Sequence, residues 1–74
     1  MKIIICGAGE VGSHATEVLD QRGHSITVID TNNHKLRSIE EIADVRTLHG
    51  NCSHVDILEQ AGVSKADMVV AATE

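Results

Sequence analysis

The chain has 74 residues, a net charge of −5 and no Phe, Trp, Tyr or Pro. A chain without aromatic side chains cannot offer the stacking platforms that hold single-stranded nucleic acids, and its negative charge opposes binding to a phosphate backbone. We therefore expect no nucleic-acid partner. Hydrophobic residues make up 42% of the chain and charged residues 23%, which is typical of a folded domain, and we predict one domain over residues 1–74.

Apolar runs of strand length recur along the chain. The first covers residues 2–6 and is continuous and rich in isoleucine, as is typical of a parallel strand that is buried on both faces. The same pattern predicts further strands at three places, 26–30, about 45–49 and about 68–72.

Helical patterns fill the three intervals between these strands. The first helix follows a glycine-rich loop and ends at Gly23. Asn32 or Asn33 caps the second helix. A capping box of Ser53 and Asp56 opens a short third helix.

This alternation of strands and helices predicts an α/β fold with a parallel sheet and right-handed crossovers. The expected architecture is Rossmann-type with four strands in the order 3-2-1-4 and helices on both faces. A doubly wound dinucleotide fold normally has six strands, and the strand at 68–72 is apolar on both faces. We therefore expect either that the sequence is a piece of a longer protein or that another surface covers this strand.

A glycine motif lies between the first strand and the first helix. Gly7, Gly9 and Gly12 fit the pattern G-x-G-x-x-G, and Asp30 ends the next strand 18 residues after Gly12. The first glycine permits a tight turn, the second allows close approach of a pyrophosphate, and the third allows the helix to pack against the strand. The helix N-terminus then presents N–H groups and a positive dipole end to phosphate. The alternative is a glycine turn that only connects strand to helix.

Asp30 indicates which nucleotide this motif would take. Its carboxylate can accept hydrogen bonds from both ribose hydroxyls and would repel a 2′-phosphate. NAD or an adenosine nucleotide is therefore favoured over NADP.

Several stretches, including the one that contains the glycine motif, resemble one family. They are Met-Lys-Ile-Ile-Ile-Cys-Gly-Ala-Gly-Glu-Val-Gly at 1–12, Val-Ile-Asp at 28–30, His-Gly-Asn-Cys-Ser at 49–53, Leu-Glu-Gln-Ala-Gly at 58–62 and Ala-Asp-Met-Val-Val-Ala-Ala-Thr at 66–73. Together they resemble the N-terminal nucleotide-binding domain of TrkA-type potassium-uptake regulators, the KTN or RCK family. The resemblance covers the whole chain.

The resemblance implies a function and a location. It implies a cytoplasmic regulator, not an enzyme, that forms a homo-oligomeric ring at the inner face of the cell membrane. There it would control a membrane potassium transporter or channel subunit by binding NAD(H) or ATP/ADP. The nucleotide-binding positions that it implies are Gly7, Ala8, Gly9, Glu10, Val11, Gly12, Asp30, Thr31, Asn51, Cys52, Ala72 and Thr73.

Glu10 departs from the family pattern, in which many members have a basic residue at this position. A carboxylate there cannot neutralise a triphosphate. NAD(H) is therefore the first expectation for the cofactor, and ATP/ADP is the alternative.

Histidine and cysteine residues suggest a metal site or a disulfide, and we expect neither. His49, Cys52 and His54 have plausible ligand spacing, but no second cluster completes a tetrahedral site. Cys6 and Cys52 end the first and third strands, so their backbones should lie about 10 Å apart, at two strand spacings. That distance exceeds the reach of a disulfide.

Two other classes of function remain open. The chain could be the cofactor-binding half of an NAD-dependent oxidoreductase whose catalytic residues lie in another domain. It could also be an assembly module that dimerises through its unfinished sheet.

Overall fold

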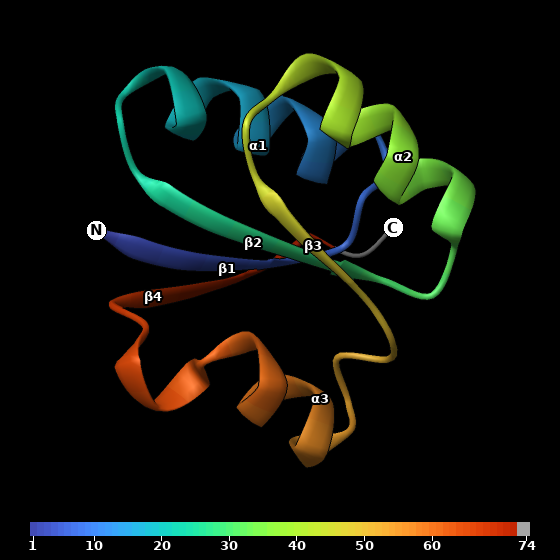
Figure 1. Ribbon diagram of the computed structural model, residues 1–74, viewed down its shortest axis with the longest axis vertical. Helices are drawn as coiled ribbons and strands as arrows, with labels where there is room; N and C mark the ends of the chain where they lie inside the picture. The colour runs from blue at the N-terminus through green and yellow to red at the C-terminus, as the bar shows by residue number, and fades with distance from the viewer. Residues whose placement is uncertain (73–74) are drawn as a thin grey trace.

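The structure, a computed structural model, describes residues 1–72 and places a four-stranded parallel sheet between two helical layers (Figure 1). The elements in chain order are β1 (Lys2–Cys6), α1 (Glu10–Gln21), β2 (Ser25–Asp30), α2 (Asn33–Ile42), β3 (Arg46–His49), α3 (Val55–Ala61), the short 3-10 helix η1 (Val63–Lys65) and β4 (Met68–Ala71). The strand order β3-β2-β1-β4 confirms the predicted Rossmann-type topology.

Strand β1 lies at the centre of the sheet because it is apolar on both faces. It pairs in parallel with β2 on one side and with β4 on the other. Ile3 and Ile5 belong to one hydrophobic cluster with α2, whereas Ile4 and Cys6 belong to a second cluster with the α3 segment. Figure 1 shows the same division, with α1 and α2 over one face of the sheet and α3 over the other.

The N-terminus of α2 confirms one of the two predicted caps. Asn32 is the N-cap, and its Oδ1 accepts hydrogen bonds from the backbone N–H groups of His34 at 2.9 Å and Lys35 at 3.2 Å. Asn33 is the first residue of the helix. Asn32 therefore satisfies two N–H groups that have no partner inside the helix.

The predicted capping box at α3 is wrong. The helix begins at Val55 with His54 as its N-cap, and no side chain caps it. Ser53 instead donates its N–H and its hydroxyl to Oδ1 of Asn51, at 2.9 and 2.7 Å. These two bonds hold Ser53 in a local turn around the Asn51 side-chain amide. Ser53 therefore does not cap the helix, and α3 begins only at Val55.

Strand β4 pairs only with β1 among the described residues, and its last predicted residue lies just beyond it. The N–H of Ala72 still donates to the Cys6 carbonyl at 2.8 Å, so the pairing geometry continues past Ala71. Met68 and Val69 are 44% and 47% exposed, which leaves apolar surface on this strand as expected. No helix in residues 1–72 has the length and apolar character that crossing a bilayer requires.

Candidate functional site

The glycine loop turns sharply where β1 ends. Gly7 has a φ of +118°, a backbone conformation that side chains other than hydrogen strongly disfavour. Its N–H donates to the Ile29 carbonyl at 2.9 Å, so the turn stays attached to β2. The predicted role of Gly7 in a tight turn is confirmed.

Gly12 brings α1 against this turn. A Cβ atom at this position would lie 1.9 Å from the Gly7 carbonyl oxygen and 3.5 Å from the side chain of Ala72. Only glycine allows this approach, which confirms the expected close packing of helix on strand. Thr16, which is fully buried, donates its hydroxyl to the Gly12 carbonyl at 2.7 Å, so this polar group is satisfied within α1.

The glycine loop leads directly into the first turn of α1, and the N-cap residue of this helix provides no side-chain cap. Gly9 is the N-cap and makes no side-chain hydrogen bond, in contrast to Asn32 at α2. The first N–H groups of a helix have no partner within it, and they carry its positive dipole end. An anionic group such as a pyrophosphate is suited to this position.

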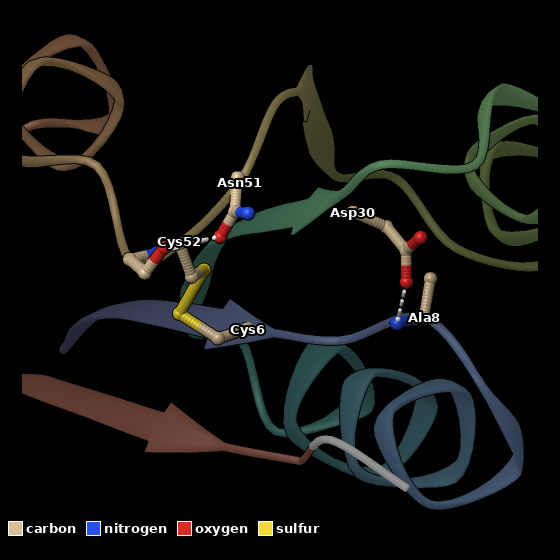
Figure 2. Close-up of a disulfide and its surroundings, with 6 residues drawn as sticks. Cys6, Ala8, Asp30, Asn51 and Cys52 are labelled. Atoms are coloured by element: carbon tan, nitrogen blue, oxygen red, sulfur yellow. Dashed lines mark hydrogen bonds between the residues drawn. A yellow bond between two sulfur atoms is a disulfide. The ribbon is translucent and has the colours of Figure 1, made fainter.

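Asp30 links the glycine loop to the start of α2. Its Oδ2 accepts a hydrogen bond from the Ala8 N–H at 2.8 Å (Figure 2), and its Oδ1 accepts one from the Asn32 N–H at 2.8 Å. The sequence reasoning missed this structural role. The available signal was the position of Asp30 two residues before a helix cap, where aspartate commonly bonds its own backbone. A carboxylate offers about four lone-pair sites, so acceptor capacity remains for a ligand.

A cavity of about 260 Å³ opens beside Asp30 at the carboxyl end of the sheet. It is lined by Cys6, Gly7, Ile29, Asp30, Thr31, Gly50, Asn51 and Cys52. Five of the predicted nucleotide-binding residues therefore meet here, and they come from the ends of β1, β2 and β3.

The other predicted positions lie outside this cavity lining. Ala8 is buried but directs its N–H to Asp30, whereas Glu10 and Val11 are exposed in the first turn of α1. Ala72 is 5% exposed and lies beneath Gly12. The prediction for Thr73 falls outside the described residues.

The expectation that Cys6 and Cys52 are too far apart is wrong. The two cysteines form a disulfide, with their Cα atoms 6.0 Å apart (Figure 2). Cys52 is not part of β3, which ends at His49. Gly50 still pairs with the Asp30 carbonyl, at 3.0 Å, and the chain then crosses the end of β2 towards β1. The distance between strands therefore does not set the distance between these residues.

The three residues with metal-ligand spacing have other partners or positions. His49 places Nε2 2.9 Å from the Thr31 carbonyl oxygen, Cys52 is in the disulfide, and His54 is the N-cap of α3. Within residues 1–72, no group of three or more His, Cys, Asp or Glu side chains could hold a metal ion.

A second cavity, of about 270 Å³, lies at the other end of the sheet. It is bordered by residues near the starts of β1, β2 and β3, by the end of α3 and by η1, and its lining includes Lys2, Arg46 and Lys65. Ligands of open α/β sheets bind at the carboxyl ends of the strands, so the candidate site is the cavity beside Asp30.

Comparison with known proteins agrees with this geometry. The family model described as the TrkA-N domain matches residues 3–74. The chain is similar to curated proteins called "Trk system potassium uptake protein TrkA", at 45% identity over 73 residues in both Vibrio alginolyticus and Halomonas elongata. A homologue so named from Pyrococcus abyssi is 33% identical over 73 residues.

These alignments cover 99% of this chain, but they span only 16% of the first two relatives and 32% of the third. The likeness therefore concerns one domain of longer proteins. The glycine loop, the strand order and the family match lead to the same conclusion: this chain belongs to the TrkA-N domain family, which has a Rossmann-like fold.

Proposed function

We propose that this domain binds NAD(H) at the carboxyl edge of its sheet and thereby regulates potassium uptake. The observation that carries the proposal is the N-terminus of α1, whose N-cap is a glycine and which follows a glycine loop held by Asp30 beside a cavity. This arrangement offers a phosphate site and a ribose acceptor next to each other.

The parts of the dinucleotide have natural positions in this geometry. The pyrophosphate lies against Gly9 and the first turn of α1, and the adenosine ribose binds Asp30. The adenine enters the cavity between Thr31 and Asn51, with Cys52 in its wall. Ala72, which is buried beneath Gly12, supports the glycine loop that holds the pyrophosphate. ADP and ATP are the alternative ligands, and the Glu10 carboxylate disfavours the triphosphate.

The names of the relatives, which refer to potassium uptake, support the potassium-transport part of the proposal. In this proposal the domain is not an enzyme. It belongs to a homo-oligomeric protein in the cytoplasm that acts on a membrane potassium transporter or channel subunit at the inner face of the membrane. The nucleotide state of the domain is the signal that the assembly transmits to the ion path.

Parallel calorimetric titrations of the full chain with NADH, NADPH, ADP and ATP test the binding proposal. We expect NADH to bind more tightly than NADPH because Asp30 repels a 2′-phosphate. Equal affinity for NADH and NADPH would contradict the ribose role. Gly9→Val should abolish binding and leave the far-UV circular dichroism largely unchanged, because its side chain fills the space that the pyrophosphate needs.

Asp30→Ala separates ribose recognition from support of the loop when it is compared with Ser13→Ala. Ser13 donates its hydroxyl to the Ala8 carbonyl at 3.1 Å and holds the same loop without facing a ribose. Asp30→Ala should weaken NADH binding by about 1.5–3 kcal/mol, the range for a hydrogen bond to a charged group, and narrow the gap to NADPH. Ser13→Ala should weaken both ligands equally. A parallel loss in both variants would restrict Asp30 to loop support.

A further inference from the structure

The disulfide forms part of the wall of the candidate nucleotide site. Cys6 and Cys52, the pair drawn in Figure 2, are both among the residues that line the cavity beside Asp30. The bond joins the end of β1 to the turn between β3 and α3, across 46 residues of sequence. A change at this bond is therefore a change at the site itself.

The turn that carries Cys52 has few other described connections to the sheet. Gly50 donates a backbone hydrogen bond to Asp30, and the hydrogen bonds between Asn51 and Ser53 stay within the turn. The His54 carbonyl accepts from Ile57 and Leu58, which ties the turn to α3 but not to the sheet. Cys52 also packs in the small cluster under α3. Among these described interactions, the disulfide is the covalent link that fixes Asn51 and Cys52 against β1.

The two cysteine residues differ in exposure. Cys6 is 6% exposed, whereas Cys52 is half-buried. We therefore expect a thiolate from solution to attack the disulfide at Cys52, the more exposed residue of the pair. In a reducing cytoplasm, the disulfides that do form in ordinary proteins are usually transient or redox-sensing.

We propose that Cys6 and Cys52 are a reversible thiol–disulfide pair whose oxidation state sets the nucleotide affinity of the cavity. The inference rests on the proposed function, since nucleotide binding is what the pair adjusts. The exchange partner is a low-molecular-weight thiol or disulfide. In the oxidising direction, the two protein thiols lose two electrons and two protons, the Cys6–Cys52 bond forms, and the partner disulfide is reduced to two thiols.

The oxidised form is the tighter binder. With the bond closed, Asn51 and Cys52 are already held at the cavity wall, so binding does not have to order them. With the bond open, part of the population has the turn displaced, and the apparent affinity falls by that fraction. We expect reduction to weaken NADH binding about five- to tenfold. By linkage, NADH shifts the thiol–disulfide equilibrium towards the disulfide by the same factor.

The test uses the full chain, oxidised with glutathione disulfide or reduced with dithiothreitol. The intact mass, which is higher by two hydrogen atoms (about 2 Da) in the reduced form, verifies each state, and NADH is then titrated calorimetrically. Cys52→Ser is the matched control and should bind NADH with the weaker affinity under both conditions. Equal affinity in the two wild-type states would overturn the proposal. So would a redox response that persists in Cys52→Ser.

Hydrogen exchange of the wild-type chain gives a second readout that needs no variant and no ligand. Reduction should speed amide exchange in residues 51–54 and leave exchange in α2 unchanged. If none of NADH, ADP and ATP binds in either state, the proposed function fails, and exchange alone then decides whether the pair holds the turn. Unchanged exchange at residues 51–54 would overturn that role.

Discussion

The two faces of the sheet are covered to very different extents. The cluster under α1 and α2 contains eight buried hydrophobic residues, whereas the cluster under α3 contains four, among the described residues. The helices differ in the same way, because α1 and α2 have 12 and 10 residues and α3 has seven (Figure 1). We infer that the first face determines the fold, while the second supports a wall of the candidate site.

The largest expected effect is a difference in stability between the two faces. Ile39 of α2 is fully buried, so Ile39→Ala should lower the free energy of unfolding by about 2–5 kcal/mol. Leu58 of α3 is half-buried, and Leu58→Ala should cost roughly 1–2 kcal/mol because less apolar surface is lost. Urea unfolding followed by circular dichroism measures both. Equal losses would remove the distinction between the faces.

Substitutions at two glycines, one near α1 and one near α3, test the same difference between the two faces of the sheet. In Gly12→Ala the new Cβ meets the Gly7 backbone at 1.9 Å, and overpacking against backbone should cost about 1–3 kcal/mol and weaken NADH binding. In Gly50→Ala the Cβ meets the end of the Ile57 side chain at 2.6 Å. This half-buried side chain can rotate, so we expect a smaller loss, measured by the same unfolding titration. A larger loss for Gly50→Ala would show that the α3 face is the rigid one.

The cap of α2 gives an effect of about 1 kcal/mol. Asn32→Ala removes the acceptor for two N–H groups and should destabilise the domain by about that amount. Asn33→Ala is the control, because Asn33 is exposed in the first turn and should change stability by no more than about 0.5 kcal/mol. If both variants melted at the same temperature as the parent, the cap would contribute nothing.

We expect the smallest change in stability at β4, together with a change in the self-association of the chain. Val69 pairs with Ile4 in register, so it lies on the α3 face, and it is 47% exposed. We expect the 74-residue chain to self-associate through this strand at micromolar concentration and Val69→Lys to shift it towards monomer in sedimentation. Val70 packs against the larger cluster, so Val70→Lys should unfold the chain instead. A monomeric parent would contradict the association.

The fold was predictable because each strand carries its own signal. The isoleucine run of β1 and the apolar segments that became β2, β3 and β4 fixed the element order, and parallel topology then left few choices. In the site, the positive φ of Gly7 and the close approach at Gly12 follow from the motif. These features depend on local sequence and on a common backbone geometry.

The turn after β3 could not be predicted in the same way. The position of Cys52 depends on how three residues cross the end of β2, and the distance between strands carries no information about that path. Ser53 could donate hydrogen bonds to the Asn51 side chain or could cap α3 instead, and the sequence alone does not favour one of these local arrangements over the other.

The two hydrogen bonds of Asp30 also constrain how this domain could change its cofactor. To accommodate a 2′-phosphate, Asp30 must be replaced by a residue without a carboxylate. This replacement leaves the N–H groups of Ala8 and Asn32 without their acceptor. The bond from Ala8 holds the glycine loop, and the bond from Asn32 begins the turn into α2. A conversion towards NADP therefore requires new acceptors for both amides as well as a new charge, so a single substitution at position 30 should produce a weak binder of either cofactor instead of a switched one.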